Sequence, residues 1–294
     1  MTASRHPSRT MLLLCLSPLF LGGCSTTRLV VRATEPLLEK SVAAMNRETD
    51  LELARAAIPA NLKMLEGMLL ADPGNPRLHL RMAEGLYGYT FAFVEATDHA
   101  RASALYRRCY AHAVQGLRAA GFPVDPRTAR RPELERAVHQ AGPGQKAGLF
   151  WAATCLAKYV DMNRDDPRSL AHIARAVTMM QRVLELDPGY YHAGPQLFFA
   201  VYYGSRPPML GGDLQRAATF FDRARRLTGG RLLMVDVLEA EFLDRQKNDR
   251  KAFRAHLMHV LHTPVGRWPE LAFANQVARA RARGLLLKEA EWFD

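Results

Sequence analysis

The chain has 294 residues, of which 48% are hydrophobic and 23% are charged, and this much apolar surface over this length excludes a disordered chain. The formal net charge of +11 raises the question of a nucleic-acid partner. Because the arginines are spread over many segments, are interleaved with acidic residues and lack clusters of base-stacking aromatics, we expect solvated helix faces and no nucleic acid.

The first residues have the pattern of an export signal. Arg5 and Arg9 precede an apolar run over residues 11–21. This run is too short to cross a bilayer as a helix, which takes about 20 residues. The small residues before Cys24 complete a Leu-Gly-Gly-Cys sequence that resembles a bacterial lipobox. It predicts a lipoprotein signal peptide over residues 1–23 and lipidation of Cys24, with an ordinary secretory cleavage site as the alternative.

The residue after the lipobox cysteine indicates the compartment. Ser25 in place of aspartate is typical of lipoproteins that reach the outer membrane. We therefore expect the mature chain in the periplasm, anchored by lipid to the outer membrane. A flexible linker is predicted over residues 24–33, followed by a folded domain over residues 34–294.

From residue 34 onward, apolar residues recur at helical spacing and no alternating run is long enough for a sheet, which predicts an all-α fold. Asn75-Pro76 and Asp166-Pro167 each place a capping side chain before a proline that fits the first helical position. The Asp-Pro-Gly segments at residues 72–74 and 187–189 predict helix ends, because proline cannot continue a helix.

Identities at a spacing of 115 residues indicate an internal duplication. The two Asp-Pro-Gly segments lie 115 positions apart, and the same offset relates Ile58, Met64, Leu69, Tyr87, Asp98, Arg101, Ala102 and Arg108 to Ile173, Met179, Leu184, Tyr202, Asp213, Arg216, Ala217 and Arg223. We predict duplicated halves over about residues 34–121 and 149–236, followed by C-terminal helices. Asp98 and Asp213 are expected to be N-caps.

Small residues inside the repeat point to tetratricopeptide-like helical hairpins stacked in a superhelix. Ala217, Phe221 and Ala224 have the small, large, small spacing of the second helix of such a hairpin. Stacked hairpins present corresponding loops on one side. The elongated connectors over residues 90–97 and 205–212 are therefore expected to border one concavity.

Two cysteines remain beyond the signal region and the lipobox. Cys109 and Cys155 both lie in helical, small-residue surroundings. Buried thiols are the favoured interpretation, and a disulfide between them is the alternative that a periplasmic location allows.

Three segments resemble a known family. Residues 61–95, 149–167 and 190–217, which include YGYTFAFVE and SRPPMLGGD, are similar to the TRAP transporter T-component (TatT) family, and the similarity covers about residues 34–285. The resemblance implies a lipoprotein of divergent tetratricopeptide-like helices. It also implies association with the periplasmic solute-binding protein of a tripartite ATP-independent periplasmic transporter, and an accessory, non-catalytic role in handling a solute, with hydrophobic solutes among the candidates.

Motifs for catalysis, metals and cofactors are missing from the sequence. No HExxH, paired CxxC, GxSxG or phosphate-binding glycine loop occurs in a fitting context. His256, His259 and His262 share one helix face, but a zinc site there needs a fourth ligand, so we interpret them as a polar face. We expect no enzyme, no metal and no cofactor.

Aromatic residues gather near the chain breaks. Most aromatics at helical spacing belong to a core, but a subset of these is predicted to line an apolar cleft with a few orienting polar groups. The candidate ligand-binding residues are Tyr87, Tyr89, Phe91, Phe93, Glu95, Phe150, Trp151, Asn163, Arg164, Phe198, Tyr202, Tyr203, Arg206, Pro207 and Pro208. The alternative is a structural adaptor that tethers partners without a ligand. A small closed homo-oligomer is also expected.

Overall fold

The computed structural model describes residues 23–294, with side chains from residue 26 onward. The predicted signal peptide up to residue 22 and the side chain of Cys24 lie outside the described part. Within residues 23–294 every regular element is a helix, which confirms the all-α prediction. Residues 24–33, for which the sequence predicts a flexible linker, are helical.

The helices follow one another along the chain with short connections. They are α1 (Gly23–Ala33), α2 (Glu35–Asn46), α3 (Leu51–Ala71), α4 (Pro76–Phe93), α5 (His99–Ala119), α6 (Arg131–Gln140), α7 (Lys146–Asp161), α8 (Pro167–Leu170), α9 (Ile173–Leu186), α10 (Tyr190–Gly204), α11 (Leu214–Thr228), α12 (Met234–Glu239), a π-helix (Ala240–Asp244), α13 (Arg250–His262), α14 (Ala272–Leu286) and α15 (Glu289–Phe293).

Local chemistry sets many helix boundaries. Each of the four predicted N-caps, Asn75, Asp98, Asp166 and Asp213, accepts at least one backbone N–H bond from the first turn of the helix that follows it. Helices α3 and α9 end directly before the two Asp-Pro-Gly segments. These predictions from the sequence are confirmed.

Helices near one another in the sequence pack closely, and small residues allow the closest approach. The main contacts join α4 to α5, α5 to α7, α7 to α9 and α10 to α11. A Cβ on Gly148 would lie 2.8 Å from the Cα of Leu117, so α7 approaches the backbone of α5 where glycine leaves room. Cys109 and Cys155 join the same two helices by a disulfide, with their Cα atoms 5.7 Å apart. The favoured interpretation as thiols is therefore wrong, and the alternative holds.

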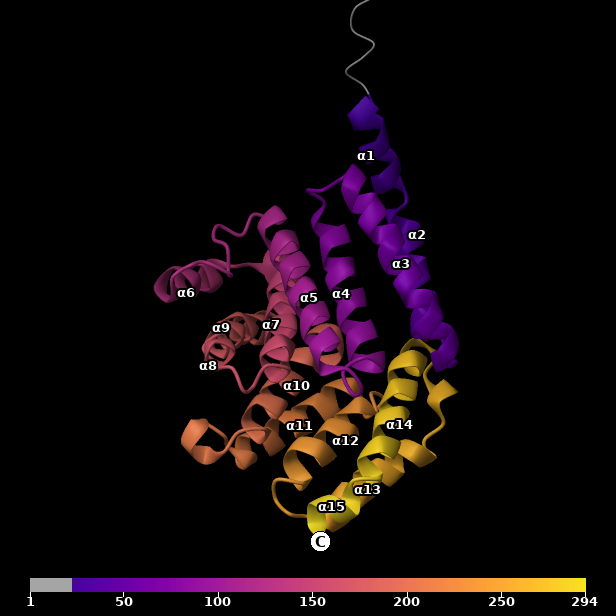
Figure 1. Cartoon of the computed structure of the whole chain (residues 1–294), viewed down its shortest axis with the longest axis vertical. Helices are drawn as coiled ribbons and strands as arrows, with labels where there is room; N and C mark the ends of the chain where they lie inside the picture. The colour runs from indigo at the N-terminus through magenta and orange to yellow at the C-terminus, as the bar shows by residue number, and fades with distance from the viewer. Residues whose placement is uncertain (1–22) are drawn as a thin grey trace, which may run out of the picture.

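The C-terminal helices return towards the start of the fold. In Figure 1, α14 (yellow) rises to meet the lower end of α3 (indigo), while α10, α11 and α12 lie below α4 and α5. Helix α14 contacts both α2 and α3. The chain therefore bends so that α14 meets α2 and α3, and these helices border the interior space described below.

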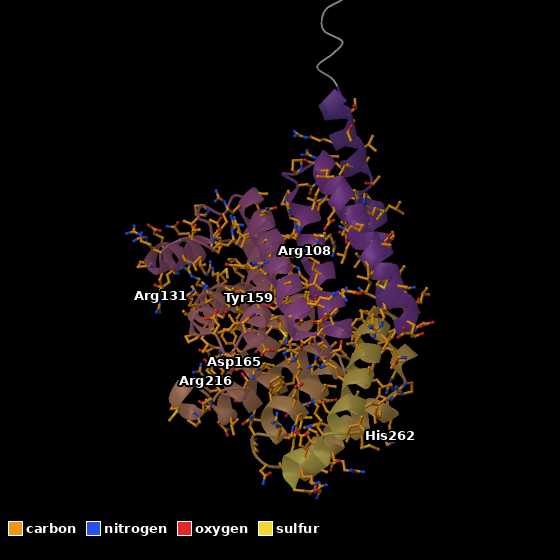
Figure 2. The ribbon with its side chains drawn as sticks, viewed as in Figure 1. Arg108, Arg131, Tyr159, Asp165, Arg216 and His262 are labelled. Carbon is orange, nitrogen blue, oxygen red and sulfur yellow. A yellow bond between two sulfur atoms is a disulfide. The ribbon has the colours of Figure 1, made fainter. Side chains whose placement is uncertain are left out.

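Charged side chains are distributed over the outer helix faces. Figure 2 shows Arg108, Arg131 and Arg216 on α5, α6 and α11, which are separate parts of the molecule. Arg108 pairs with Glu66, and Arg131 pairs with Glu135. This pattern agrees with the interpretation of the positive charge as solvated helix faces.

Candidate functional site

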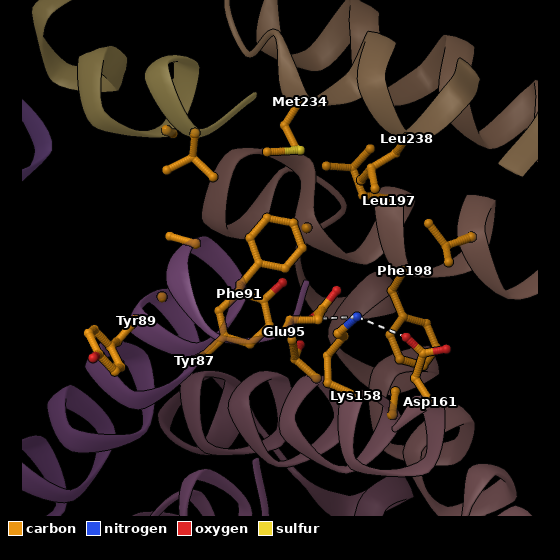
Figure 3. A pocket seen from close by; sticks show the side chains of 18 of the residues that line it. Tyr87, Tyr89, Phe91, Glu95, Lys158, Asp161, Leu197, Phe198, Met234 and Leu238 are labelled. Atoms are coloured by element: carbon orange, nitrogen blue, oxygen red, sulfur yellow. Dashed lines mark hydrogen bonds and ion pairs between the residues drawn. The ribbon is translucent and has the colours of Figure 1, made fainter. Parts of the chain in front are cut away.

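A cavity of about 1310 Å³ lies between the N-terminal helices and the C-terminal helices. Its lining comes from α2, α3, α4, α7, α10, α12, the π-helix and α14, and most of it is aliphatic or aromatic. Figure 3 shows Met234, Leu197 and Leu238 across the cavity from Phe91 and a small group of charged side chains. An apolar hollow with a few polar groups is typical of small-molecule sites.

Both elongated connectors reach this cavity. Glu95 and Ala96 follow α4, and Arg206, Pro207 and Leu210 follow α10, and all five line it. This agrees with the expectation that the two connectors border one concavity.

Two glycines allow the sharp turn of the second connector. Gly211 has a φ of 85°, and a Cβ on Gly212 would lie 1.8 Å from the carbonyl oxygen of Arg206. The repeated glycines in the sequence therefore fold the connector back on itself beside Arg206.

Eleven of the fifteen candidate ligand-binding residues line the cavity. They are Tyr87, Tyr89, Phe91, Glu95, Phe150, Trp151, Arg164, Phe198, Tyr202, Arg206 and Pro207. Their shared location agrees with one cleft, although Phe150 and Trp151 are themselves 4% and 3% exposed and form part of the packed wall.

The other four candidates do not line the cavity. Phe93 packs against Tyr89 and Phe273, so its ring belongs to the core. Tyr203 stacks on Phe220 with ring centroids 5.9 Å apart and so faces α11.

The last two of these four residues are Asn163, which is polar, and Pro208, which lies in the second connector. The amide of Asn163 donates to the hydroxyl of Ser103 and to the carbonyl of Tyr159, so it ties α7 to α5. Pro208 begins a 3₁₀ turn of the connector, away from the cavity wall. For Phe93 and Tyr203, the helical spacing of the aromatic residues did not show which side chains face the cavity and which face a neighbouring helix.

A compensated charge network occupies one side of the cavity. The carboxylate of Glu95, which is 7% exposed, accepts from the Tyr106 hydroxyl at 2.5 Å and pairs with Lys158 Nζ at 2.9 Å and with Arg281 Nη1 at 3.2 Å. Lys158 also pairs with Asp161 at 2.9 Å, as Figure 3 shows. These partners replace the water that each buried charge loses, so the charged forms of the side chains are tolerated inside the protein.

The pKa values of the two carboxyl groups reflect this network. Burial alone would raise the pKa of Glu95, but the charges of Lys158 and Arg281 outweigh burial and lower it. Burial likewise opposes ionisation of Asp161, yet Lys158 and Arg164 lower its pKa to about 2. Both groups are therefore charged at neutral pH, and each is already matched by a cation of the protein.

Arg206 differs from these cations. Its Nη1 donates to the Tyr202 carbonyl at 2.9 Å, and its guanidinium lies 4.0 Å from the centre of the Tyr202 ring. Within residues 26–294 no carboxylate forms an ion pair with it. Burial lowers its pKa, and the charge of Asp161 offsets only part of that effect. Arg206 therefore presents a positive charge to the cavity without an anionic partner from the protein.

Several cavity residues were not among the candidates. Lys158, Asp161, Tyr191, Leu238 and Arg281 all line the cavity. Arg281 comes from α14, far along the sequence from Glu95, so no local pattern connects the two residues. Lys158 and Asp161 lie one helical turn apart, and this spacing is a signal from which their ion pair could have been expected.

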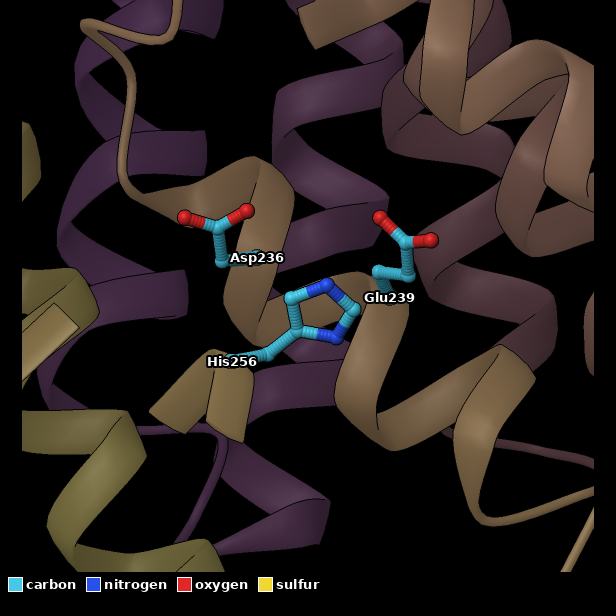
Figure 4. Close-up of side chains that lie close together, drawn as sticks. All are labelled: Asp236, Glu239 and His256. Carbon is cyan, nitrogen blue, oxygen red and sulfur yellow. The ribbon is translucent and has the colours of Figure 1, made fainter. Parts of the chain in front are cut away.

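A second titratable cluster lies outside the cavity. Ligand atoms of Asp236, Glu239 and His256 lie within 4.8 Å of one another, as Figure 4 shows. However, Arg225 Nη2 bridges the two carboxylates at 2.8 Å and 2.5 Å, and Asp244 accepts from His256 at 2.7 Å. The guanidinium already compensates these carboxylates, so we interpret the cluster as an ion-pair network that joins α11, α12 and α13.

Two histidines of the predicted polar face, His256 and His259, bond to different carboxylates of this network. His259 Nδ1 bonds to Asp236 at 2.8 Å, whereas His256 bonds to Asp244.

Among the helices in residues 23–294, none has both the length and the apolar character that a membrane span requires.

Two comparisons place the chain among known proteins. A family model described as "TRAP transporter T-component" matches residues 47–293, which include the cavity lining from α3 to α14. A protein from Treponema pallidum (strain Nichols), described as "Uncharacterized protein", is 24% identical to the chain over 323 residues. That similarity covers 98% of this chain and 99% of the relative.

Proposed function

Because the chain belongs to the TRAP transporter T-component family, we propose that it docks the periplasmic solute-binding protein of a tripartite ATP-independent periplasmic transporter and binds or passes a hydrophobic solute. The role is accessory and non-catalytic. The observation that carries the proposal is the cavity of about 1310 Å³, which is larger than most small-molecule pockets and mainly apolar.

The polar groups of the cavity suggest how a solute is oriented. Glu95, Lys158 and Arg281 neutralise one another, whereas Arg206 has no carboxylate partner. An apolar chain fits between Phe91, Phe198 and Leu238, and an acidic or strongly polar end group fits beside Arg206. Charge-assisted hydrogen bonds to arginine are stronger than neutral ones and would fix this orientation.

We also infer a lipid-anchored form of the protein. The Leu-Gly-Gly-Cys sequence supports lipidation at Cys24, and Ser25 supports the outer membrane as the destination, with the folded domain in the periplasm. Mass spectrometry of the membrane-extracted protein tests the anchor, because an acylated N-terminal Cys24 is expected and an unmodified mature N-terminus contradicts it.

The internal duplication and the tetratricopeptide-like superhelix remain proposals, and the helix boundaries support them. Helices α4 and α5 begin at residues 76 and 99, and α10 and α11 begin at residues 190 and 214, within one residue of an offset of 115. The N-caps Asp98 and Asp213 accept from Arg101 and Arg216, which are equivalent positions at that offset. Two copies would then supply the two connectors that reach the cavity.

Solute binding is testable with a neutral fluorescent probe, N-phenyl-1-naphthylamine, added to the protein from residue 26 onward. The wild type is expected to bind the probe and to gain thermal stability from it by mass action. Leu238→Glu places a charge in the apolar wall and should weaken binding at least tenfold, whereas Leu70→Glu, at a position 86% exposed, should not. Equal binding by both variants would remove the cavity from the mechanism, provided their circular dichroism is unchanged.

The second candidate is an adaptor that tethers partners without a ligand of its own. It is favoured by the exposure of Met209 and Leu210, at 88% and 66%, on the connector beside the cavity. Co-purification with the cognate solute-binding protein is expected in both cases. If the partner binds but no probe enters the wild-type protein, the adaptor is the better account. A small closed homo-oligomer is a further proposal, which light scattering in solution tests.

A further inference from the structure

The start of helix α10 contains an unusual backbone turn. Tyr191, His192 and Ala193 have φ values of 46°, 57° and 61°, which place three successive residues in the left-handed region. Side chains with a Cβ are disfavoured in this region, and runs of such residues are rarer than single ones. Strain of this kind persists only where the surroundings hold it, and it gathers at ligand sites and switches.

The equivalent start in the first half is regular. Helix α4 begins behind the N-cap Asn75 and has no positive φ among its residues. In contrast, α10 begins behind Gly189, which provides no side-chain cap, and it contains Pro195, which lacks a backbone donor. The left-handed turn is therefore a feature of the second half and is not a general requirement of this fold.

The strained turn places Tyr191 at the cavity. Tyr191 lines the cavity with 41% of its surface exposed, and its ring lies edge-on to Trp151 with centroids 4.8 Å apart. Its hydroxyl donates to Glu84 Oε1 on α4 at 3.0 Å. On the other side, a Cβ on Gly194 would lie 2.6 Å from the Phe150 ring, so the backbone rests directly on that ring. A few contacts thus hold the turn in its strained form.

We propose that residues 191–193 form a gate of the cavity, with Tyr191 as its moving side chain. In the strained state Tyr191 is bound to Glu84 and covers Trp151. In the relaxed state the turn becomes right-handed, which redirects the Tyr191 side chain and opens the apolar wall to a solute. A solute that displaces the Tyr191 ring from Trp151 gains the strain released by the turn. The proposal rests on the solute-binding role proposed above.

The backbone state can be tested by the sign of a stability difference. His192 is exposed and left-handed, and glycine tolerates that conformation whereas alanine does not. His192→Gly should therefore melt about 2–4 °C above His192→Ala. In a right-handed helix the order of the two melting temperatures reverses. Thr219 of α11 is the control position, where Thr219→Ala should melt above Thr219→Gly. A reversed order at His192 would overturn the gate.

The motion can be tested by the rate at which N-phenyl-1-naphthylamine enters, measured by stopped-flow fluorescence. Tyr191→Phe removes the hydrogen bond to Glu84 and keeps the ring, so entry should become about two- to tenfold faster. Tyr190→Phe is the matched control, because Tyr190 does not line the cavity, and its rate should equal that of the wild type. Equal rates for all three proteins would overturn the gate alone. Failure of the wild type to bind the probe would overturn both the gate and the solute-binding role.

Discussion

At the residue scale, cations of the cavity differ in whether the protein already compensates them. Lys158 has carboxylate partners in Glu95 and Asp161, whereas Arg206 has a carbonyl and an aromatic ring. Loop position made Arg206 a candidate from the sequence alone. Lys158 was missed because its role depends on Glu95, which folding brings close from 63 residues away.

The first residue-scale prediction concerns the charge of Arg206. Arg206→Met should weaken binding of dodecanoate about 10- to 100-fold, because a charge-assisted bond to the carboxylate is lost, and should leave dodecan-1-ol nearly unchanged. Arg216→Met is the control, since Arg216 lies over the Tyr203 ring at the same 4.0 Å but does not line the cavity. Isothermal titration calorimetry measures both ligands. Equal losses for acid and alcohol would contradict the role of Arg206.

The second prediction concerns the pair His79 and His112, whose Nδ1 atoms lie 3.1 Å apart between α4 and α5. Burial, followed by the influence of His79 and Arg108, lowers the pKa of His112 to about 4. The unfolded chain then binds more protons between pH 6.5 and pH 4, so the contribution to stability is present above pH 6.5 and is lost as the pH falls towards 4.

Urea unfolding across this pH window measures the effect. His112→Gln should reduce the acid-induced loss of unfolding free energy by about 1–2 kcal/mol, after allowance for the partial exposure of the ring. The exposed His139 provides the control substitution, His139→Gln. An unchanged pH profile in His112→Gln would show that this ring is not titrating in the window.

At the element scale, the starts and ends of helices followed from short-range chemistry, whereas their close approaches did not. Proline, glycine and capping side chains act on their own neighbours, so Asn75 and Asp213 could be assigned from the sequence. The left-handed turn of α10 gave no such signal, because Tyr191, His192 and Ala193 do not favour positive φ. Tertiary contacts impose that conformation.

The distance between helices predicts that alanine at two different glycine positions changes the free energy of unfolding in opposite directions. Gly148→Ala should destabilise the protein by about 1–3 kcal/mol, because the new Cβ would overlap the backbone of Leu117 on α5. Gly67→Ala should stabilise it by about 0.5–1 kcal/mol, since Gly67 is exposed inside α3 with no atom within 4 Å of the new Cβ. Urea denaturation compares the two variants. A stabilised Gly148→Ala protein would mean that α5 and α7 are further apart.

At the scale of the whole molecule, the repeat pattern predicted two connectors on one concavity but not what closes the other side. The closure depends on α14, which returns to α2 and α3 and brings Arg281 to Glu95. No sequence pattern relates these segments, and the contacts join residues almost 190 positions apart. The apolar character of the site was therefore predictable from its aromatics, whereas the part of its wall that α14 supplies was visible only in the fold.

The central claim is that this cavity receives an apolar solute with its polar end near Arg206. A crystal structure of the protein from residue 26 onward with 12-bromododecanoic acid tests it most directly, because bromine marks the end of the chain by anomalous scattering. We predict a bromine peak inside the cavity, in the apolar part bounded by Phe91, Phe198 and Leu238, with the carboxylate beside Arg206. A cavity filled by side chains, or bromine only on the outer surface, would contradict the account.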